Sequence, residues 1–178
     1  GEVGLIIPGY MYVHPEGRAV PLQTGIYCDE MIPGLRRLVE TVHKAGSKVF
    51  FQLHHAGTQT SRRLVGRTPM GPSDTRRHPI SLSKPDKMTE EDIALVIRAF
   101  GEAARCAAEA GADGVQFHAA HGYLISQFLS PFFNDREDAW GGSDENRFRF
   151  LKEVFLEVRR ILPDSMPVIV KINAHDYV

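Results

Sequence analysis

The sequence predicts an α/β fold, a partial (β/α)8 TIM barrel in which about four parallel strands are joined by crossover helices. Apolar runs that suit buried strands alternate along the chain with segments whose apolar residues recur at helical spacing. The runs become polar at their C-terminal ends, which is the edge that carries ligands in α/β folds. None of them is followed by a glycine fingerprint of the dinucleotide or P-loop kind, which favours a barrel over a Rossmann sheet.

The first part of the chain predicts a strand, a helix and a second strand. The apolar run at 5–7 is closed by Pro8, so a buried strand is expected there. Helical spacing of Ile, Leu and Val then predicts a helix that runs from a cap at Asp29 to Gly46. The run at 48–53 predicts the second buried strand, which ends in a pair of histidines.

The middle of the chain predicts a long excursion followed by a helix and a third strand. Residues 58–88 contain four prolines with scattered Arg and Ser, and irregular segments of that length are usually lids or binding loops. A capping-box sequence at Thr89 opens the expected helix, which stops at Gly111. The run at 113–117 predicts the third strand.

A third helix at 151–162, ended by Pro163, and a fourth strand at 168–172 complete the pattern. A closed barrel needs roughly 250 residues, so a chain of 178 residues with four strands does not close one. The expectation is one partial barrel domain over 1–178, truncated at both ends. Its open edges and uncovered apolar surface predict contact with the remainder of a barrel or self-association.

The composition excludes several classes of function. The chain is 43% hydrophobic and 24% charged, as in an ordinary globular domain, and 21 basic residues against 22 acidic ones give a net charge of −1. A nucleic-acid partner is not expected, because the positive field is missing. No apolar run approaches the ~18 residues of a membrane span and no signal peptide is visible, so no membrane partner and a cytoplasmic location are expected. Cys28 and Cys106 have no metal-binding or redox spacing.

The densest group of chemically active residues follows the third strand, where 117–123 reads Phe-His-Ala-Ala-His-Gly-Tyr. One interpretation is structural, with imidazoles that cap backbone carbonyls and a tyrosine that packs. In a second, His118 and His121 donate hydrogen bonds to a carbonyl oxygen and Tyr123 donates a proton. A third interpretation is a metal site formed from several strand ends by His54, His118, His121 and His175.

Two polar residues interrupt apolar strands. Gln52 is expected to be buried, and its amide suits either the imide-like edge of a ligand or a neighbouring barrel residue. Lys171 stands among Val and Ile, so it is expected to meet an acid, a ligand anion or a cofactor dipole, or to reach solvent. The loop aromatics suit either ordinary packing or the wall of a flat ligand: Tyr10, Tyr12, Phe132, Phe133 and Trp140.

A set of motifs spread along the chain resembles the Old Yellow Enzyme family of FMN-dependent NAD(P)H:flavin oxidoreductases. The core of the resemblance is VQFHAAHGYLISQFLSP at 115–131, with NDR at 134–136, WGGS at 140–143 and ENR at 145–147. Further matches are GLII at 4–7, PGL at 33–35, HKAG at 43–46, Gln52 with HAG at 55–57, GPS at 71–73 and KIN at 171–173. The resemblance covers essentially the whole chain and corresponds to strands two to five of the family's barrel.

The resemblance implies FMN as the cofactor, lying across the C-terminal mouth of the barrel, with NADH or NADPH as the reductant. Carried over residue by residue, Gln52 binds the pyrimidine edge of the flavin, and the backbone at Gly9 and Ala56 passes close to the ring. Lys171 falls beside flavin N1 and O2, where many members have arginine. A cation there stabilises the anionic reduced flavin.

For the substrate, the resemblance implies an ene-reductase, which passes hydride to an electron-poor alkene such as an enone. His118 and His121 match the pair that binds the carbonyl or nitro oxygen, and Tyr123 matches the proton donor. The alternatives are a metal-dependent TIM-barrel hydrolase, disfavoured because its His-x-His pattern is missing, and an inactive barrel fragment. No metal is expected. The family's first strand and its phosphate-binding loops would lie outside 1–178, so activity is expected of the full-length protein.

Overall fold

The computed structural model describes residues 2–82 and 84–175. Its helices are α1 (Ile32–Lys44), α2 (Arg62–Val65), α3 (Glu90–Ala110), α4 (Leu124–Leu129) and α5 (Asp144–Ile161), with short 3-10 turns at Pro15–Gly17 and Asp29–Met31. Its strands are β1 (Leu5–Ile6), β2 (Met11–Tyr12), β3 (Lys48–His54), β4 (Met70–Gly71), β5 (Asp86–Lys87), β6 (Gly114–Ala119) and β7 (Val168–Ile172).

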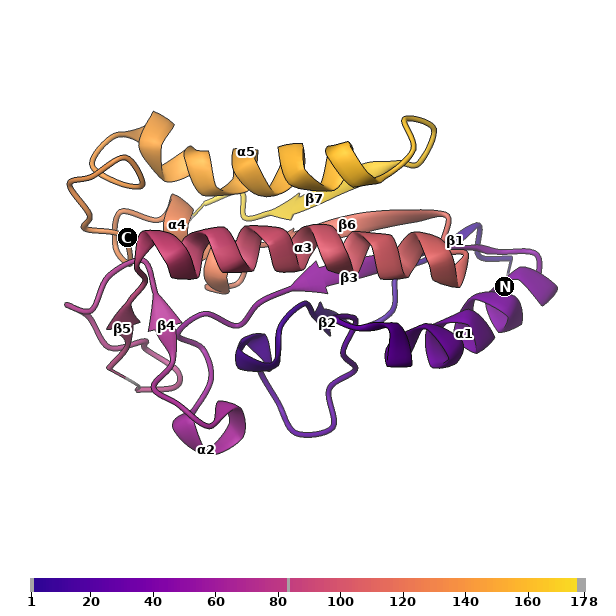
Figure 1. Cartoon of the computed structure of the whole chain (residues 1–178), viewed down its shortest axis with the longest axis horizontal. Coiled ribbons are helices and arrows are strands. Elements are labelled where there is room, and N and C mark those ends of the chain that lie inside the picture. Colours follow the sequence, from indigo (N-terminus) through magenta and orange to yellow (C-terminus); the bar gives the residue numbers. More distant parts are fainter. Residues whose placement is uncertain (1, 83, 176–178) are drawn as a thin grey trace.

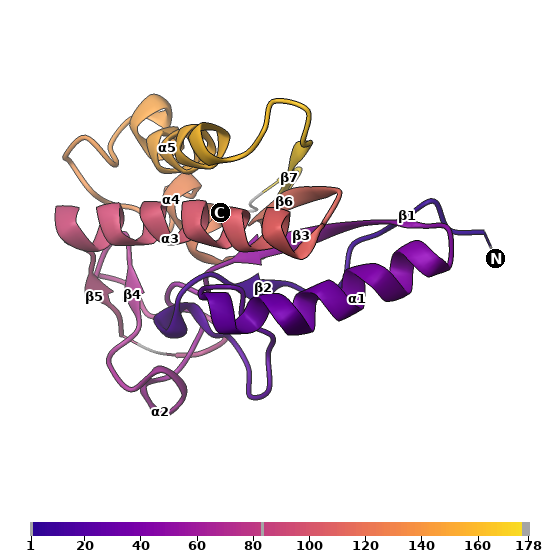
Figure 2. The ribbon, with the colours of Figure 1, turned by 45° about the vertical axis from the view of Figure 1, so that its right-hand side comes forward.

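The main sheet is parallel and has the strand order β1-β3-β6-β7, with β2 also paired to β3. The long helices α1, α3 and α5 connect these strands and lie side by side along the sheet (Figure 1). In the turned view, α5, α3 and α1 again lie one below the other (Figure 2). The predicted half of a (β/α)8 barrel, with parallel strands and crossover helices, is therefore confirmed.

The helix-facing side of the sheet forms the hydrophobic core. The Phe117 ring on β6 meets the Phe100 ring on α3 edge to face, with 6.1 Å between centroids. Phe51, Leu53 and Val115 are likewise fully buried in this core. Because successive side chains of a strand point to opposite faces, the residues between these lie on the other, inner face of the sheet.

The inner face carries polar residues at its C-terminal end. Gln52 on β3 lies opposite Gln116 on β6, and His118 on β6 lies opposite Lys171 on β7. The exposed apolar side chains of the sheet lie mainly on its edge strands, as for Leu5 on β1 and Ile172 on β7, the latter 61% exposed. The uncovered apolar surface is thus concentrated at the two edges of the half-barrel.

The helix ends agree with the sequence in one case and differ in two. The capping box of α3 is confirmed, because Thr89 Oγ1 accepts from the Asp92 amide at 3.1 Å and Asp92 Oδ2 accepts from the Thr89 amide at 2.9 Å. The predicted cap at Asp29 is wrong: a 3-10 turn precedes α1, and Asp29 is its first residue. Helix α5 begins at Asp144, earlier than predicted, because Ser143 caps a polar first turn that apolar spacing does not reveal.

No helix within the described residues is long and apolar enough to cross a membrane.

The excursion at 58–88 is more ordered than expected. It contains α2 and the short parallel pair of β4 and β5. Its middle and its C-terminal end are joined by Arg136, a buried residue whose Nη1 donates to the carbonyls of Pro72 at 2.9 Å and Met88 at 2.8 Å. These contacts hold the excursion against the segment that follows β6.

Candidate active site

A tight turn after β6 brings the predicted catalytic residues together. The Tyr123 amide donates to the Ala120 carbonyl at 3.3 Å, and the two residues between them have positive φ, 61° at His121 and 74° at Gly122. Two left-handed central residues define a type I′ turn. Histidine tolerates this conformation better than most side chains, and the His121 amide is held by Asn173 Oδ1 at 3.1 Å.

The turn places the rings of His121 and Tyr123 against the ring of His118. The ring centroids of His118 lie 5.1 Å from His121 and 4.9 Å from Tyr123, both nearly perpendicular. His118 is buried, Tyr123 is 8% exposed and His121 is exposed. A ligand bound at this cluster would therefore contact one buried imidazole, one exposed imidazole and a phenol.

The hydrogen bonding of His118 fixes which nitrogen is a donor. Its Nδ1 accepts from the Ala120 amide at 3.4 Å, so in the neutral ring the proton is on Nε2. Burial, followed by the charges of Lys171 and His121, lowers the pKa of His118 to about 4. Burial and Lys171 also lower the pKa of His121. At pH 7 His118 is therefore a neutral N–H donor.

Tyr10 and His54 also belong to this cluster. Tyr123 Oη donates to Tyr10 Oη at 3.1 Å, and the His54 ring packs between the two phenols, with centroids 4.2 Å from Tyr123 and 4.6 Å from Tyr10. His54 is the last residue of β3 and Tyr10 lies in the loop after β1, and this position at strand ends is the signal that could have indicated them. Tyr10 was expected only as a possible wall of a flat ligand, and His54 only as a possible metal ligand.

His54 is an unusual buried histidine. It is fully buried, and within the described part of the chain neither ring nitrogen has a hydrogen-bond partner. Burial, with the nearby histidines, lowers its pKa well below the usual value, so the ring is neutral. Because unpartnered buried nitrogens are costly, this position suits a site that is completed by an incoming polar group.

Gln127 on α4 fixes the turn and was not singled out from the sequence. Its fully buried amide accepts from the Thr58 amide at 3.1 Å through Oε1. Its Nε2 donates to the carbonyls of Gly122 at 2.6 Å and Ala56 at 3.3 Å. One side chain thereby ties the loop after β3 to the turn after β6. The available signal was a glutamine within the otherwise apolar sequence Leu-Ile-Ser-Gln-Phe-Leu.

Three of the four residues expected near the flavin ring lie at or just after the C-terminal ends of β1 and β3. Gln52 is buried on the inner face, and its Nε2 donates to Gln116 Oε1, the neighbouring-strand contact that was one of its two expected uses. Ala56 is fully buried, and its amide donates to the Gly17 carbonyl at 2.9 Å. Gly9 is exposed in the loop between β1 and β2.

Lys171 lies on β7 opposite His118 and is partly buried. Among the residues that the structure describes, no carboxylate oxygen lies within 4.0 Å of its ammonium group, so the expected acid partner is not seen there. Its charge acts instead on the two histidines, whose pKa values it helps to lower. A ligand dipole or anion, or solvent, remains as the partner of this cation.

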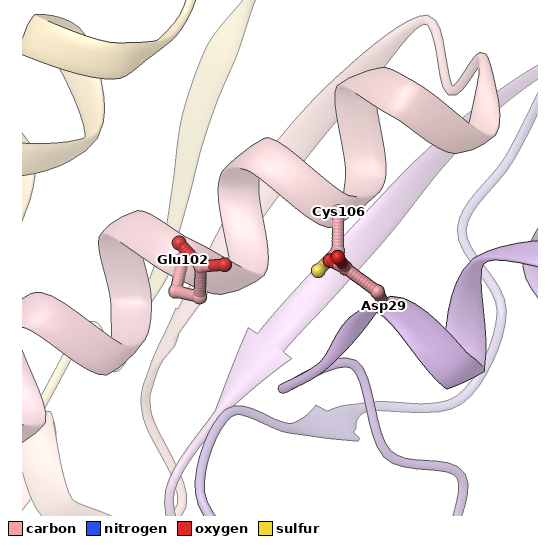
Figure 3. A group of neighbouring side chains, drawn as sticks. All are labelled: Asp29, Glu102 and Cys106. Atoms are coloured by element: carbon pink, nitrogen blue, oxygen red, sulfur yellow. The ribbon is translucent and has the colours of Figure 1, made fainter.

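The histidines considered for a metal site do not gather into one. Over 2–82 and 84–175, the group of three side chains close enough to share an ion consists of Asp29, Glu102 and Cys106. These lie where α3 passes the turn before α1 (Figure 3). Arg105 already bonds to both carboxylates, and its Nη2 lies 3.7 Å from Cys106 Sγ. This group is an ion-pair network around a guanidinium.

The inner face fits the flavin that the resemblance implies. An amide such as that of Gln52 both donates and accepts, which matches an edge of alternating carbonyl and N–H groups. Lys171 supplies a cation without a carboxylate partner in the described ranges, and the neighbouring His54 supplies unpartnered buried nitrogens. The chemistry of these donors is what a flat, polar-edged cofactor requires.

Comparisons with known proteins show the family to which the chain is similar. A profile of the NADH:flavin oxidoreductase / NADH oxidase family matches residues 1–178. An NADPH dehydrogenase of Clostridium acetobutylicum is 42% identical over 179 residues, which cover 99% of this chain and 51% of the relative. A probable NADH-dependent flavin oxidoreductase of Bacillus subtilis is 42% identical over 160 residues, which cover 89% of this chain and 42% of the relative. The chain spans about half the length of the curated relatives it matches.

Solved structures give the same result. Morphinone reductase, in complex with tetrahydroNAD, superposes with a TM-score of 0.88 at 30% identity over 94% of this chain and 50% of that one. An old yellow enzyme homologue from Zymomonas mobilis superposes with a TM-score of 0.86 at 33% identity over 94% of this chain and 49% of that one. FMN with NAD(P)H is the cofactor pair that these matches imply. The chain belongs to the NADH:flavin oxidoreductase / NADH oxidase family, the Old Yellow Enzyme family that its motifs resemble.

Proposed function

We propose that the full-length protein is an ene-reductase that uses FMN and NADH or NADPH to reduce an electron-poor alkene such as an enone. The observation that carries this proposal is the contact of His118, His121 and Tyr123 at the C-terminal edge of a parallel half-barrel. When bound, the flavin supplies hydride transfer, first from the nicotinamide and then to the alkene β-carbon. The residues of this chain supply binding, orientation and the proton.

The two imidazoles hold the substrate oxygen. His118 is neutral at pH 7 and presents its Nε2 proton, because Nδ1 is engaged by the Ala120 amide. Negative charge develops on the carbonyl or nitro oxygen during reduction, and donors fixed in advance stabilise that charge. His121 adds a second donor from the exposed side of the cluster.

Tyr123 delivers the proton to the α-carbon. Burial, followed by the hydrogen bond and charge of Tyr10, raises the pKa of Tyr123, so its phenol stays protonated at neutral pH. The phenol lies beside His118, which holds the substrate oxygen in this proposal. A general acid at such a position typically accelerates its step by about 10²- to 10⁴-fold.

The flavin is held on the inner face of the sheet. Gln52 binds its pyrimidine edge, which requires the amide to exchange its contact with Gln116 for one with the ring. Lys171 would hold the flavin at N1 and O2, and the backbone at Gly9 and Ala56 would pass along the ring. The inner-face placement of Gln52 and Lys171, two strands apart, supports this arrangement.

The segment 1–178 is proposed as one partial barrel domain that works in the cytoplasm on a small molecule. Its two cysteines, Cys28 and Cys106, are free thiols, as is usual in a reducing compartment. Its net charge of −1 gives no field for nucleic acid.

The experiment is a steady-state assay of the purified full-length protein with NADH or NADPH and 2-cyclohexen-1-one. We expect a yellow protein whose flavin is reduced by one or both nucleotides and reoxidised by the enone. A protein that oxidises the nucleotide with oxygen but leaves the enone unreduced, at any pH between 6 and 8, would contradict the proposal.

A further inference from the structure

Tyr123, the proposed proton donor, is hydrogen-bonded to a second phenol, that of Tyr10. Their oxygens lie 3.1 Å apart, with Tyr123 as the donor, and their ring centroids lie 5.4 Å apart. Tyr123 is 8% exposed, whereas Tyr10 is only partly buried and belongs to the wall of a hollow of about 750 Å³. Loop 20–25 and the first turn of α1 form much of the remaining wall.

Proton donation by Tyr123 creates an electrostatic problem. Loss of its proton leaves a phenolate in a buried position, where an unpaired charge is costly. The rings packed on it are those of His54, His118 and Tyr10. Both imidazoles have lowered pKa values and are neutral at pH 7, so neither supplies a positive charge. Tyr10 is the one of the three whose hydroxyl is hydrogen-bonded to Tyr123; its oxygen accepts from the Tyr123 hydroxyl, and a hydroxyl can turn to donate once Tyr123 loses its proton.

We propose that Tyr10 is a relay residue that reloads Tyr123 during substrate reduction. The Tyr123 O–H bond breaks as the C–H bond forms at the substrate α-carbon, whose electron pair was left when the β-carbon received hydride. In the same step the Tyr10 hydroxyl turns and its proton moves to the Tyr123 oxygen, so the negative charge passes to Tyr10. A proton from bulk solvent, which reaches Tyr10 through water in the adjoining hollow, then returns both phenols to their starting state. The relay deepens the proposed function and rests on it.

His54 supports the relay without carrying the proton. Its ring stands edge-on to Tyr123 and tilted against Tyr10, at centroid distances of 4.2 and 4.6 Å. Within residues 2–82 and 84–175 neither of its nitrogens is hydrogen-bonded to either phenol. The ring therefore packs against both phenols without competing for their oxygens, which stay in contact with each other.

The test uses Tyr10→Phe in the full-length flavin-loaded protein, because phenylalanine keeps the ring contacts and removes only the hydroxyl. Single-turnover reoxidation of the reduced protein by 2-cyclohexen-1-one is followed in mixtures of H₂O and D₂O. Wild type should show a curved dependence on the deuterium fraction, since two protons move, and Tyr10→Phe a linear one. The variant should be slower by roughly 10-fold, the effect of one lost hydrogen bond to a charged group.

The matched control is Tyr12→Phe. Tyr12 lies two residues away on β2, is buried and stacks on Tyr27, with 5.4 Å between centroids. It should leave the reoxidation rate and the curved isotope dependence unchanged. Reduction of the flavin by NAD(P)H should be unchanged in both variants, since no phenol proton moves in that step.

A second readout needs neither substrate nor turnover. Ultraviolet difference titration, with Tyr123→Phe to assign the signal, follows the ionisation of Tyr123. Tyr10→Phe should shift the pKa of Tyr123, because it removes the hydroxyl to which the Tyr123 phenol is hydrogen-bonded. A tyrosine that merely fills space would leave this titration unchanged.

The possible outcomes separate the two proposals. Failure of the wild-type protein to reduce the enone contradicts the proposed function, while the titration still reports on the phenol pair. The relay is overturned by an active enzyme in which Tyr10→Phe keeps the wild-type rate and the curved isotope dependence. It is equally overturned by a Tyr123 titration that is identical with and without the Tyr10 hydroxyl.

Discussion

Tyr123 is the residue whose chemical role can be isolated most cleanly. Tyr123→Phe keeps the ring that packs on His54 and His118 but removes the proton donor. We expect reoxidation of the reduced flavoprotein by an enone to slow by about 10²- to 10⁴-fold, with flavin reduction by NAD(P)H nearly intact. Stopped-flow absorbance measures the two half-reactions separately. Equal slowing of both would show that Tyr123 shapes the site without donating the proton.

Lys171 is expected to set the redox potential of the flavin. It has no carboxylate partner in the part of the chain that the structure describes, so its charge is available to the reduced, anionic ring. Lys171→Met should lower the reduction potential and weaken FMN retention. Potentiometric titration and flavin content after gel filtration check both effects. A wild-type potential with full occupancy would mean that Lys171 only extends to solvent.

The sequence identified the His118, His121 and Tyr123 group because its members are neighbours in the chain after one strand. It did not place Tyr10 in that group, and it grouped His54 with His118 and His121 only as metal ligands, because these contacts join segments more than 60 residues apart in the chain. The same holds for Gln127, whose partners Thr58 and Gly122 come from different strand ends. Such contacts depend on how parallel strands lie beside one another, which local sequence does not encode.

At the scale of elements, the long strands and helices were predictable from apolar periodicity. Strand β3 and helix α3 appear with the expected type and nearly the expected bounds, because each buries a long apolar face. The two-residue strands β2, β4 and β5 were not predicted. Each is held by pairing to a distant strand or by anchors such as Arg136. A strand of two residues is also too short to show a hydrophobic period in the sequence.

Asp113 joins three elements at the N-terminal end of the sheet. Its carboxylate accepts from His43 on α1 at 2.7 Å, from Lys48 on β3 at 2.8 Å and from the Val49 amide at 2.9 Å. Burial alone would raise the pKa of Asp113, but these bonds outweigh it and lower the pKa to about 2. The N-terminal edge of such a sheet contributes to stability, as the ligand edge contributes to function.

The lowered pKa predicts a defined dependence of stability on pH. Because folding lowers the pKa of Asp113, its carboxylate stabilises the fold at pH values above the unfolded pKa of ~3.9. This contribution is lost as the pH falls toward 2. Asp113→Asn should lose about 1–2 kcal/mol of unfolding free energy at pH 6, and little at pH 2. Urea unfolding of the full-length protein at both pH values measures this, with the exposed Asp164→Asn as control. An equal loss at both pH values would contradict the assignment.

At the scale of the whole molecule, the half-barrel has two unpaired strand edges. Leu5 and Ile6 on β1 and Val170 and Ile172 on β7 expose apolar side chains at these edges. Such edges pair with other chains or with the rest of a barrel. The relatives are about twice as long, which agrees with coverage by further strands of the same polypeptide.

The 178-residue chain produced by itself should therefore self-associate. We expect it to elute as a dimer or larger and to carry little FMN, because two open edges leave its flavin face incomplete. Size-exclusion chromatography with light scattering and a visible spectrum decide this. A monodisperse monomer of 19.9 kDa with stoichiometric flavin would show that the half-barrel is self-sufficient.

The central claim is that His118 and His121 together bind the oxygen of a ligand above the flavin. The most direct measurement is titration of the oxidised full-length flavoprotein with a phenol, followed in the visible flavin spectrum. His118→Ala and His121→Ala should each raise the phenol dissociation constant by roughly 10-fold or more, because each removes a donor to the phenolate oxygen. His43→Ala, at the opposite edge of the sheet, should leave it unchanged. Unchanged phenol binding in both His118→Ala and His121→Ala would contradict the account.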